Sequence, residues 1–268
     1  MPTSGRIICG LRAHGAVSLS LDEIAAMRRS PLQGCGEPFS ISALKHIDEQ
    51  TLGVLAALQA AMRSSGLPGE PGSSYYAQWG ALAAPRYLGR AMMSPSVARF
   101  KAEGAWGVSP HMVPYRSLHS ISGTVSQFLS LHGPNFGVGG GDSGVAELLL
   151  TGMPLLASMR LPGLWLVASR VEPEQTPTEE GRPAAGSYCQ AVALALVPES
   201  EPASHRLELL PRGMGSACFD LATLATWLDS PGTMFDLGGA GQVALFPHAS
   251  SRDARYTSLI SSVASAPH

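Results

Sequence analysis

The segment "GPNFGVGGGDSG", residues 133–144, combines residue types that support chemistry in several contexts. Three consecutive glycines are followed by Asp142, Ser143 and Gly144, and the apolar run "VAELLLTGMPLLASM" comes directly after them. Glycine-rich turns ahead of a helix leave backbone N–H groups free, and these groups can bind an anion or support a nucleophile. The turn is therefore the first place to look for a functional site.

The letters "GDSG" at 141–144 match the nucleophile motif of trypsin-like serine proteases, in which a histidine is the base for the serine. Those enzymes are all-β and carry a second motif around that histidine. Here His111, His119 and His132 lie in no such motif, and the serine opens a helical pattern. The sequence argues against a trypsin-like site.

Gly139, Gly141 and Gly144 also satisfy the GxGxxG pattern of dinucleotide-binding turns, and Glu172 would then be the acid that binds the ribose. However, the pattern lies in the middle of the chain and the strand before it is short. Glu172 comes 28 residues after Gly144, which exceeds the usual separation. A dinucleotide site remains an alternative, supported by a weak motif.

The elements that must position this turn alternate between strands and helices. A Ser18 or Ser20 N-cap begins a helix, and one long amphipathic helix over 42–67 is predicted to end at Gly66. The run 145–159 is apolar almost all round, which predicts a helix buried between layers. Strands are predicted at 6–17, 135–140, 164–171, 188–198, 205–210 and 242–246. This order predicts an α/β layered sheet with helices on both faces.

A longer stretch, residues 107–172, resembles the nucleophile region of β-ketoacyl synthases. It shares a "SPxxxP" segment, a helix, "GP", a strand, a turn before "xSG", a buried helix and a strand ending in an acid. The helix ending in "SSGL" and the later strand "AVALALVPES" extend the resemblance to about residues 1–200. It implies a thiolase-like fold, N-terminal half only, with a mixed sheet and residues 201–268 as a short extension packed on it, loose at its end.

The chain departs from that family at the nucleophile. The family's catalytic cysteine precedes "xSG", where this chain has Gly141, and the turn is one residue shorter. The family's catalytic histidines and lysine come from a C-terminal half that the residues after 200 are too few to supply, and His205 and His248 lie in no matching motif. The resemblance thus implies a truncated pseudo-ketosynthase of the chain-length-factor type, whose degenerate turn is Gly141, Asp142, Ser143 and Gly144, with no catalytic residue.

The same resemblance implies two further sets of residues. The candidates for an acyl pocket are His119, Phe136 and Gly140. The candidates for a dimer interface are Asn135, Phe136, Gly137 and Val138, because in the family the strand before the nucleophile turn runs antiparallel to its counterpart across the dimer. Such an edge would invite aggregation if it were exposed alone, so we expect a stable hetero- or homodimer.

Charge, hydropathy and cysteine spacing argue against nucleic-acid-binding, membrane-spanning and metal-binding proteins. The net charge of −2 gives no reason to expect a nucleic-acid partner, and no apolar stretch has the uninterrupted length of a membrane span. The four cysteines stand apart from one another and have no histidine nearby at metal-ligand spacing, so we expect no metal site and reduced thiols. We also expect no cofactor. These features predict a cytoplasmic protein.

The function that the resemblance to β-ketoacyl synthases implies is a non-catalytic ketosynthase-like subunit of fatty-acid or polyketide-type biosynthesis. It would pair with a catalytic ketosynthase, shape its acyl tunnel and meet an acyl carrier protein. The alternative is a standalone acyl-transferring or hydrolytic enzyme that uses Ser143 in the turn from Gly139 to Gly144.

Overall fold

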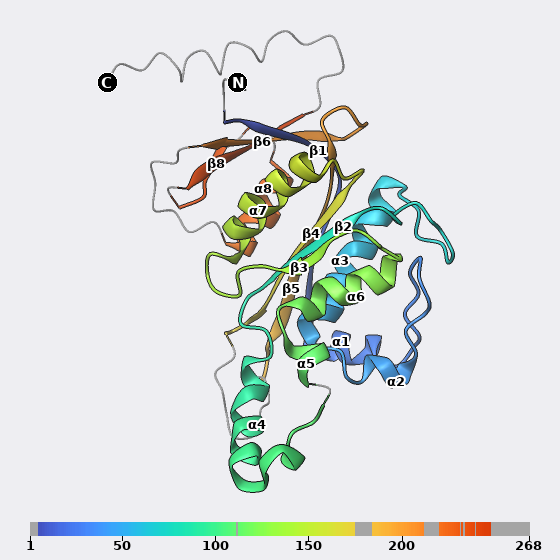
Figure 1. The fold of residues 1–268 in the computed structure, drawn as a ribbon, viewed down its shortest axis with the longest axis vertical. Coiled ribbons are helices and arrows are strands. Elements are labelled where there is room, and N and C mark those ends of the chain that lie inside the picture. Colours follow the sequence, from blue (N-terminus) through green and yellow to red (C-terminus); the bar gives the residue numbers. More distant parts are fainter. Residues whose placement is uncertain are drawn as a thin grey trace.

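The computed structural model describes residues 5–110, 112–174, 184–211, 220–230, 232, 234–238 and 240–247. His111, Cys218 and His248 lie outside these residues, as do residues 248–268, which we predicted to be loose. The described residues build one mixed sheet in the order β3-β2-β4-β5-β1-β6-β8-β7, with helices on both faces (Figure 1). This confirms the predicted α/β class.

The strands coincide closely with the apolar runs of the sequence. Their bounds are β1 Ile7–Ser20, β2 Gly80–Pro85, β3 Asn135–Gly137, β4 Leu164–Glu172, β5 Tyr188–Pro198, β6 His205–Pro211, β7 Met234–Asp236 and β8 Gly241–Pro247. β2 is parallel to both β3 and β4, whereas β5 is antiparallel to both β4 and β1. β6 then pairs with β1, so the part of the chain after residue 200 continues the same sheet.

The two faces of the sheet have side chains of different size. On β5, Ala191, Ala193 and Ala195 belong to one core cluster, while Val192 and Leu194 belong to the other. The small side chains let α3 approach closely, and a Cβ on Gly15 of β1 would lie 2.3 Å from the Ala57 carbonyl oxygen. Strands buried on both faces need no polar alternation, which explains their continuous apolar runs.

The helices divide between these faces (Figure 1). The face with small side chains carries α1 (Leu21–Met27), α2 (Ile41–Leu44), α3 (Glu49–Ser65) and α6 (His119–Leu129), and the opposite face carries α7 (Gly144–Met159) and α8 (Leu221–Leu228). Two further helices, α4 (Arg90–Glu103) and α5 (Met112–Arg116), and the 3-10 turn η1 (Gly104–Gly107) lie between β2 and α6 in the chain. No helix among the described residues has the length and apolar character needed to cross a bilayer.

The single helix predicted over 42–67 is wrong. It is broken into α2 and α3, because Asp48 adopts an extended conformation and caps α3 by accepting a hydrogen bond from the Gln50 N–H at 2.8 Å. Its end at Gly66, in the left-handed region with φ 66°, is confirmed. Of the two serines proposed to cap the first helix, Ser20 does so, in a capping box with Glu23.

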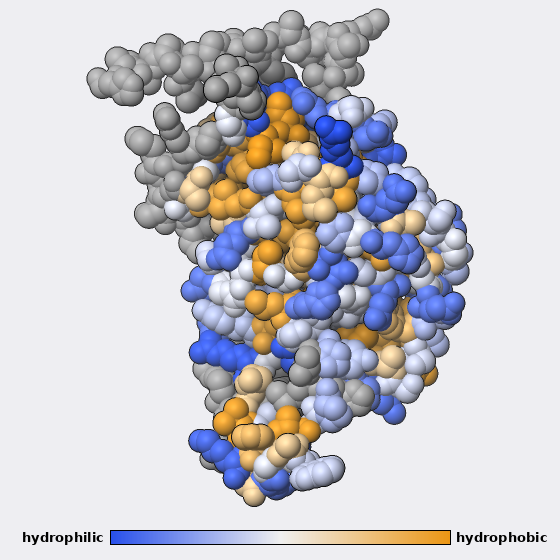
Figure 2. All heavy atoms as spheres, viewed as in Figure 1, coloured by the Kyte–Doolittle hydropathy of each residue, from blue (hydrophilic) through white to orange (hydrophobic). Residues whose placement is uncertain are grey.

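The prediction that the helix over 145–159 is buried between layers is corrected in part. The side of α7 that faces the sheet is buried, but Thr151, Ala157 and Met159 on its outer side are exposed. The buried side of α7 shares one core cluster with the sheet and with Leu221, Leu224, Trp227 and Leu228 of α8. Figure 2 shows apolar side chains gathered on the surface where α7 lies.

Candidate functional site

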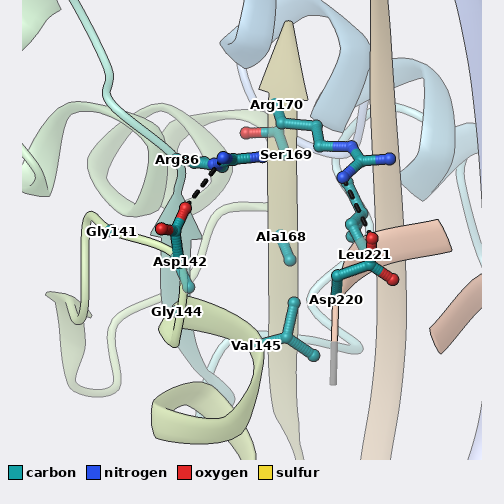
Figure 3. A pocket seen from close by; sticks show the side chains of 11 residues that line it. Arg86, Gly141, Asp142, Gly144, Val145, Ala168, Ser169, Arg170, Asp220 and Leu221 are labelled. Atoms are coloured by element: carbon teal, nitrogen blue, oxygen red, sulfur yellow. Dashed lines mark hydrogen bonds and ion pairs between the residues drawn. The ribbon is translucent and has the colours of Figure 1, made fainter. Parts of the chain in front are cut away.

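The glycine turn lies where the fold places its ligand sites. Parallel strands β2 and β4 end beside the start of α7, and a cavity of about 290 Å³ opens there (Figure 3). Crevices at the carboxyl ends of parallel strands are the usual ligand sites of α/β sheets. The cavity is lined by Ala84, Arg86, Gly141, Asp142, Gly144, Val145, Ala168, Ser169, Arg170, Asp220 and Leu221.

The turn is tight, and two of its glycines are required by its geometry. Gly139 and Gly140 have φ of 68° and 112°, which side-chain-bearing residues rarely adopt. A Cβ on Gly139 would also lie 2.8 Å from the Gly144 Cα. Gly141 differs, because nothing lies within 4 Å of the position where its Cβ would project. The position that the resemblance assigns to a thiol is open space.

Asp142 turns its carboxylate toward Arg86 at the end of β2, and the two charges are 2.8 Å apart (Figure 3). The Arg86 guanidinium also contacts Glu172 at 3.4 Å and Glu174 at 3.3 Å. One cation thus joins the turn to the carboxyl end of β4, and the ion pair stands at the rim of the cavity.

A second cation, Arg170, lines the other side of the cavity. It lies 3.2 Å from Glu172 and 3.2 Å from Asp220, and its Nε donates to Gln190. Asp220 also caps α8 by accepting from the Thr223 N–H at 2.9 Å. Burial alone would raise the pKa of Asp220, but the hydrogen bonds from Thr223 and Arg170 outweigh it and lower that pKa. The charged side chains that line the cavity are therefore all held in ion pairs.

Gln50 forms hydrogen bonds to both Arg86 and Ser169, which line the cavity, and the sequence analysis missed it. Its amide donates to the Arg86 carbonyl at 2.9 Å, and its carbonyl accepts from the Ser169 hydroxyl at 3.1 Å. The side chain is buried on α3. A polar residue within the buried stretch of an amphipathic helix was the available signal.

Tyr87 connects the glycine turn to α4. Its backbone is in the left-handed region, with φ 52°, and its N–H donates to the Gly140 carbonyl at 3.0 Å. The guanidinium carbon of Arg86 lies 5.5 Å and that of Arg90 lies 4.8 Å from the centre of its ring, within the range of cation–π contacts.

Ser143 donates its hydroxyl to the carboxylate of Glu147, one helical turn further on, rather than to a histidine. Both residues are at the start of α7, where a carboxylate interacts favourably with the helix dipole. Glu147 and Asp142 put negative charge beside the turn where a dinucleotide pyrophosphate would bind, and Glu172 is already held by Arg86 and Arg170. Ser143 therefore occupies the N-cap position of α7, where its side chain pairs with Glu147 and makes no hydrogen bond to the backbone N–H groups of the helix.

The described cysteines are poor nucleophiles. Cys9, Cys35 and Cys189 are free and buried. Burial raises the pKa of Cys9 to about 12 and that of Cys35 to about 11, and it raises the pKa of Cys189 as well. Because the thiolate is the reactive form, none of these three thiols is activated.

The predicted acyl-pocket residues do not line this cavity together. His119 is exposed at the first position of α6, and its Nδ1 lies 3.3 Å from the Ser122 hydroxyl. Phe136 is exposed on β3, and Gly140 packs against Leu118. β3 pairs with β2 along one edge, and within the described strands its other edge has no partner. The acyl-pocket residues and the dimer-interface residues therefore stay predictions.

Comparison with known proteins supports the fold. No protein-family model and no curated protein matches the sequence. A solved structure described as the ishigamide ketosynthase/chain length factor is similar, with TM-score 0.52 and 14% identity, over 78% of this chain and 69% of that chain. A β-ketoacyl synthase from Burkholderia phymatum STM815 matches with TM-score 0.51 and 12% identity, over 79% of this chain and 66% of that chain.

These matches show the fold of the molecule, which is the thiolase-like fold seen in β-ketoacyl synthases. Among its structural neighbours are ketosynthase/chain length factor proteins. At this level of identity the similarity shows the fold alone.

Proposed function

We propose that this chain is a non-catalytic, ketosynthase-like subunit of fatty-acid or polyketide-type biosynthesis. It pairs with an active β-ketoacyl synthase and shapes the acyl tunnel of that partner. Residues 1–200 form the ketosynthase-like domain and residues 201–268 a short extension. The ketosynthase fold and the neighbour described as a ketosynthase/chain length factor support the proposal.

The observation that carries the proposal is Gly141 at the amino end of α7. A nucleophile at this place would benefit from the helix dipole and from free N–H groups. Gly141 offers no side chain, and the neighbouring Asp142 is a carboxylate paired with Arg86. A carboxylate beside those N–H groups disfavours a second anion. The turn has the place of a nucleophile loop, directly before α7, and lacks the nucleophile.

Pairing is proposed along the free edge of β3. An unpaired strand edge offers a row of N–H and C=O groups for another strand. Asn135, Phe136, Gly137 and Val138 are the residues of this interface, and Phe136 is 45% exposed. His119, Phe136 and Gly140 would then lie close to the acyl chain held by the partner. An acyl carrier protein would deliver that chain, in the cytoplasm.

The proposal is tested by measuring condensation with acyl- and malonyl-carrier proteins. The assay compares this chain alone, a catalytically active β-ketoacyl synthase from the same source alone, and the two together. We expect no turnover by this chain, and product formation by the mixture that is unchanged by Ser143→Ala. Turnover by the isolated chain that is lost in Ser143→Ala would instead identify it as a standalone enzyme.

A further inference from the structure

A second cleft opens beside β1, at the point where β6 stops pairing with that strand. Its volume is about 650 Å³, against about 290 Å³ for the cavity at the glycine turn, and the two share no lining residue. β6 pairs with β1 from Ile7 to Leu11, and beyond Leu11 the described strands pair with β1 only through β5. The carboxyl ends of α3 and α8 form the other walls of the cleft.

A β-bulge places Arg12 at the wall of this cleft. The register of β1 against β5 shifts between Leu11 and Ala13, so Arg12 is the extra residue of the strand. Its Nη1 donates to the Pro202 carbonyl at 2.8 Å, which holds the guanidinium beside the cleft. A guanidinium has further N–H donors in the same plane, and these remain for a ligand.

Two half-buried histidines line the same cleft. His14 follows Arg12 on β1, and His205 begins β6 opposite Leu11. The Ser204 hydroxyl donates to the Leu11 carbonyl at 2.8 Å, so its oxygen accepts from the Nδ1 of His205 at 3.0 Å. The Nε2 of His205 is therefore the nitrogen that takes up a proton when this side chain becomes charged.

The histidines decide the charge of the cleft. Burial and the charge of His14 lower the pKa of His205, so the two imidazoles repel each other when both are protonated. The lining holds one carboxylate, Asp229, whose Oδ1 lies 3.7 Å from the Nε2 of His14. Its side chain is 82% exposed, and water screens such a charge. Below neutral pH the cleft therefore carries unbalanced positive charge.

We propose that this cleft binds a phosphate group between Arg12, His14 and His205. A phosphate dianion between these groups removes their mutual repulsion and accepts charge-assisted hydrogen bonds from the guanidinium and from protonated imidazole. The phosphate lies at the wall of β1 and β6, because the carboxyl end of α3 carries the negative end of a helix dipole.

The volume of the cleft is in the range of small-molecule sites, so a phosphate monoester can enter as well as the free ion. Binding here does not depend on a ketosynthase partner, since the cleft shares no residue with the glycine-turn cavity or with β3. The site therefore goes beyond the proposed function.

Isothermal titration of the full chain with inorganic phosphate at about pH 6 tests the site. We expect Arg12→Ala and His205→Gln each to raise the Kd at least about tenfold, because each removes a charge-assisted hydrogen bond. Arg29→Ala and His132→Gln are the matched controls, since both residues are exposed outside the cleft, and they should leave the Kd unchanged. Circular dichroism checks that every variant is folded. A Kd that Arg12→Ala and His205→Gln leave unchanged would overturn the inference.

Asp229→Asn supplies a change of opposite sign. It removes the carboxylate near His14 and keeps all the cations, so we expect the Kd for phosphate to fall about twofold. A variant that only disturbed the fold would not bind phosphate more tightly. A Kd raised by Asp229→Asn would contradict an anion at this place.

The affinity should rise as the pH falls. Sulfate is the probe for this measurement, because it stays a dianion where phosphate itself takes up a proton. We expect the parent to bind sulfate at least about tenfold more tightly at about pH 5.5 than at about pH 8, and this dependence to weaken in His14→Gln and in His205→Gln. The same pH profile in the parent and in both histidine variants would show that the histidines do not bind the anion.

Phenyl phosphate distinguishes the two sources of the phosphate group. A Kd lower than that of inorganic phosphate, and raised by Arg12→Ala, identifies a phosphate monoester as the ligand. An equal or higher Kd identifies the free ion. If neither compound binds to the parent chain, the inference is wrong, whereas the proposed function is untouched by that result.

Discussion

Gly141 and Asp142 mark the place where this chain departs from a catalytic turn. The sequence was sufficient to locate Gly141, because the position before "xSG" can be counted along the chain. It could not reveal that Asp142 is paired with Arg86, which lies far away in the sequence, directly after β2, and is brought close by the sheet. The same holds for Gln50, whose role depends on contacts with β2 and β4.

The glycines of the turn should differ in their tolerance of a side chain. Gly139→Ala should destabilise the protein by about 2 kcal/mol, because alanine is strained in the left-handed region and its Cβ would meet Gly144. Gly141→Ala is the matched control and should change the free energy of unfolding by less than about 0.5 kcal/mol. Urea denaturation measures both. Equal losses would contradict the geometry of the turn.

Restoring a thiol provides a further test at this scale. Gly141→Cys should fold, because open space surrounds the Cβ position, and it should react with iodoacetamide at one site more than the parent chain. The native parent should remain unlabelled at Cys9, Cys35 and Cys189, whose thiols are buried and have raised pKa values. Peptide mass spectrometry locates the labels. Rapid labelling of those three residues in the folded parent would disagree with their burial.

At the scale of the elements, the spacing of apolar residues predicted part of the helical structure correctly. The stripe of apolar residues correctly indicated a helix up to Gly66, but the same spacing ran through Asp48 without marking a break. Asp48 favours an N-cap because its carboxylate can accept from the backbone N–H groups of the next turn. Whether such a residue caps a new helix depends on tertiary contacts, here the ion pair with Arg116 at 3.0 Å.

Asp48 should make the stability of the protein depend on pH. Burial and the neighbouring Glu49 raise the pKa of Asp48 to about 6, above its usual 3.8, although Arg116 lowers it. The native state then binds this proton more tightly than the unfolded state. The resulting stabilisation is present below about pH 3.8 and is lost as the pH rises through 6.

Asp48→Asn removes this titration and keeps an oxygen to cap α3. The stability of the parent relative to this variant should therefore increase as the pH is lowered from 7 to 4.5, measured by urea denaturation at each pH. Parallel profiles for the two proteins would show that Asp48 does not titrate in this range.

For the molecule as a whole, the order of apolar runs was enough to predict a mixed α/β sheet with helices on both faces. Strands such as β5, bounded by polar turns and buried on both faces, are recognisable from their continuous apolar sequence. The projection of α4 and η1 beyond the sheet was not predicted, because the sequence of this segment contains no information about whether its apolar side chains are covered. The exposed sides of α7 and α4 are properties of the assembled chain.

The measurement that tests the central claim most directly is native mass spectrometry after co-expression with catalytically active β-ketoacyl synthases from the same source. Peptide analysis then locates any acyl adduct on each subunit. We predict a complex of the two chains with the acyl group on the cysteine of the partner alone. A free chain that itself carries an acyl adduct would contradict the account, and the adduct would identify its nucleophile.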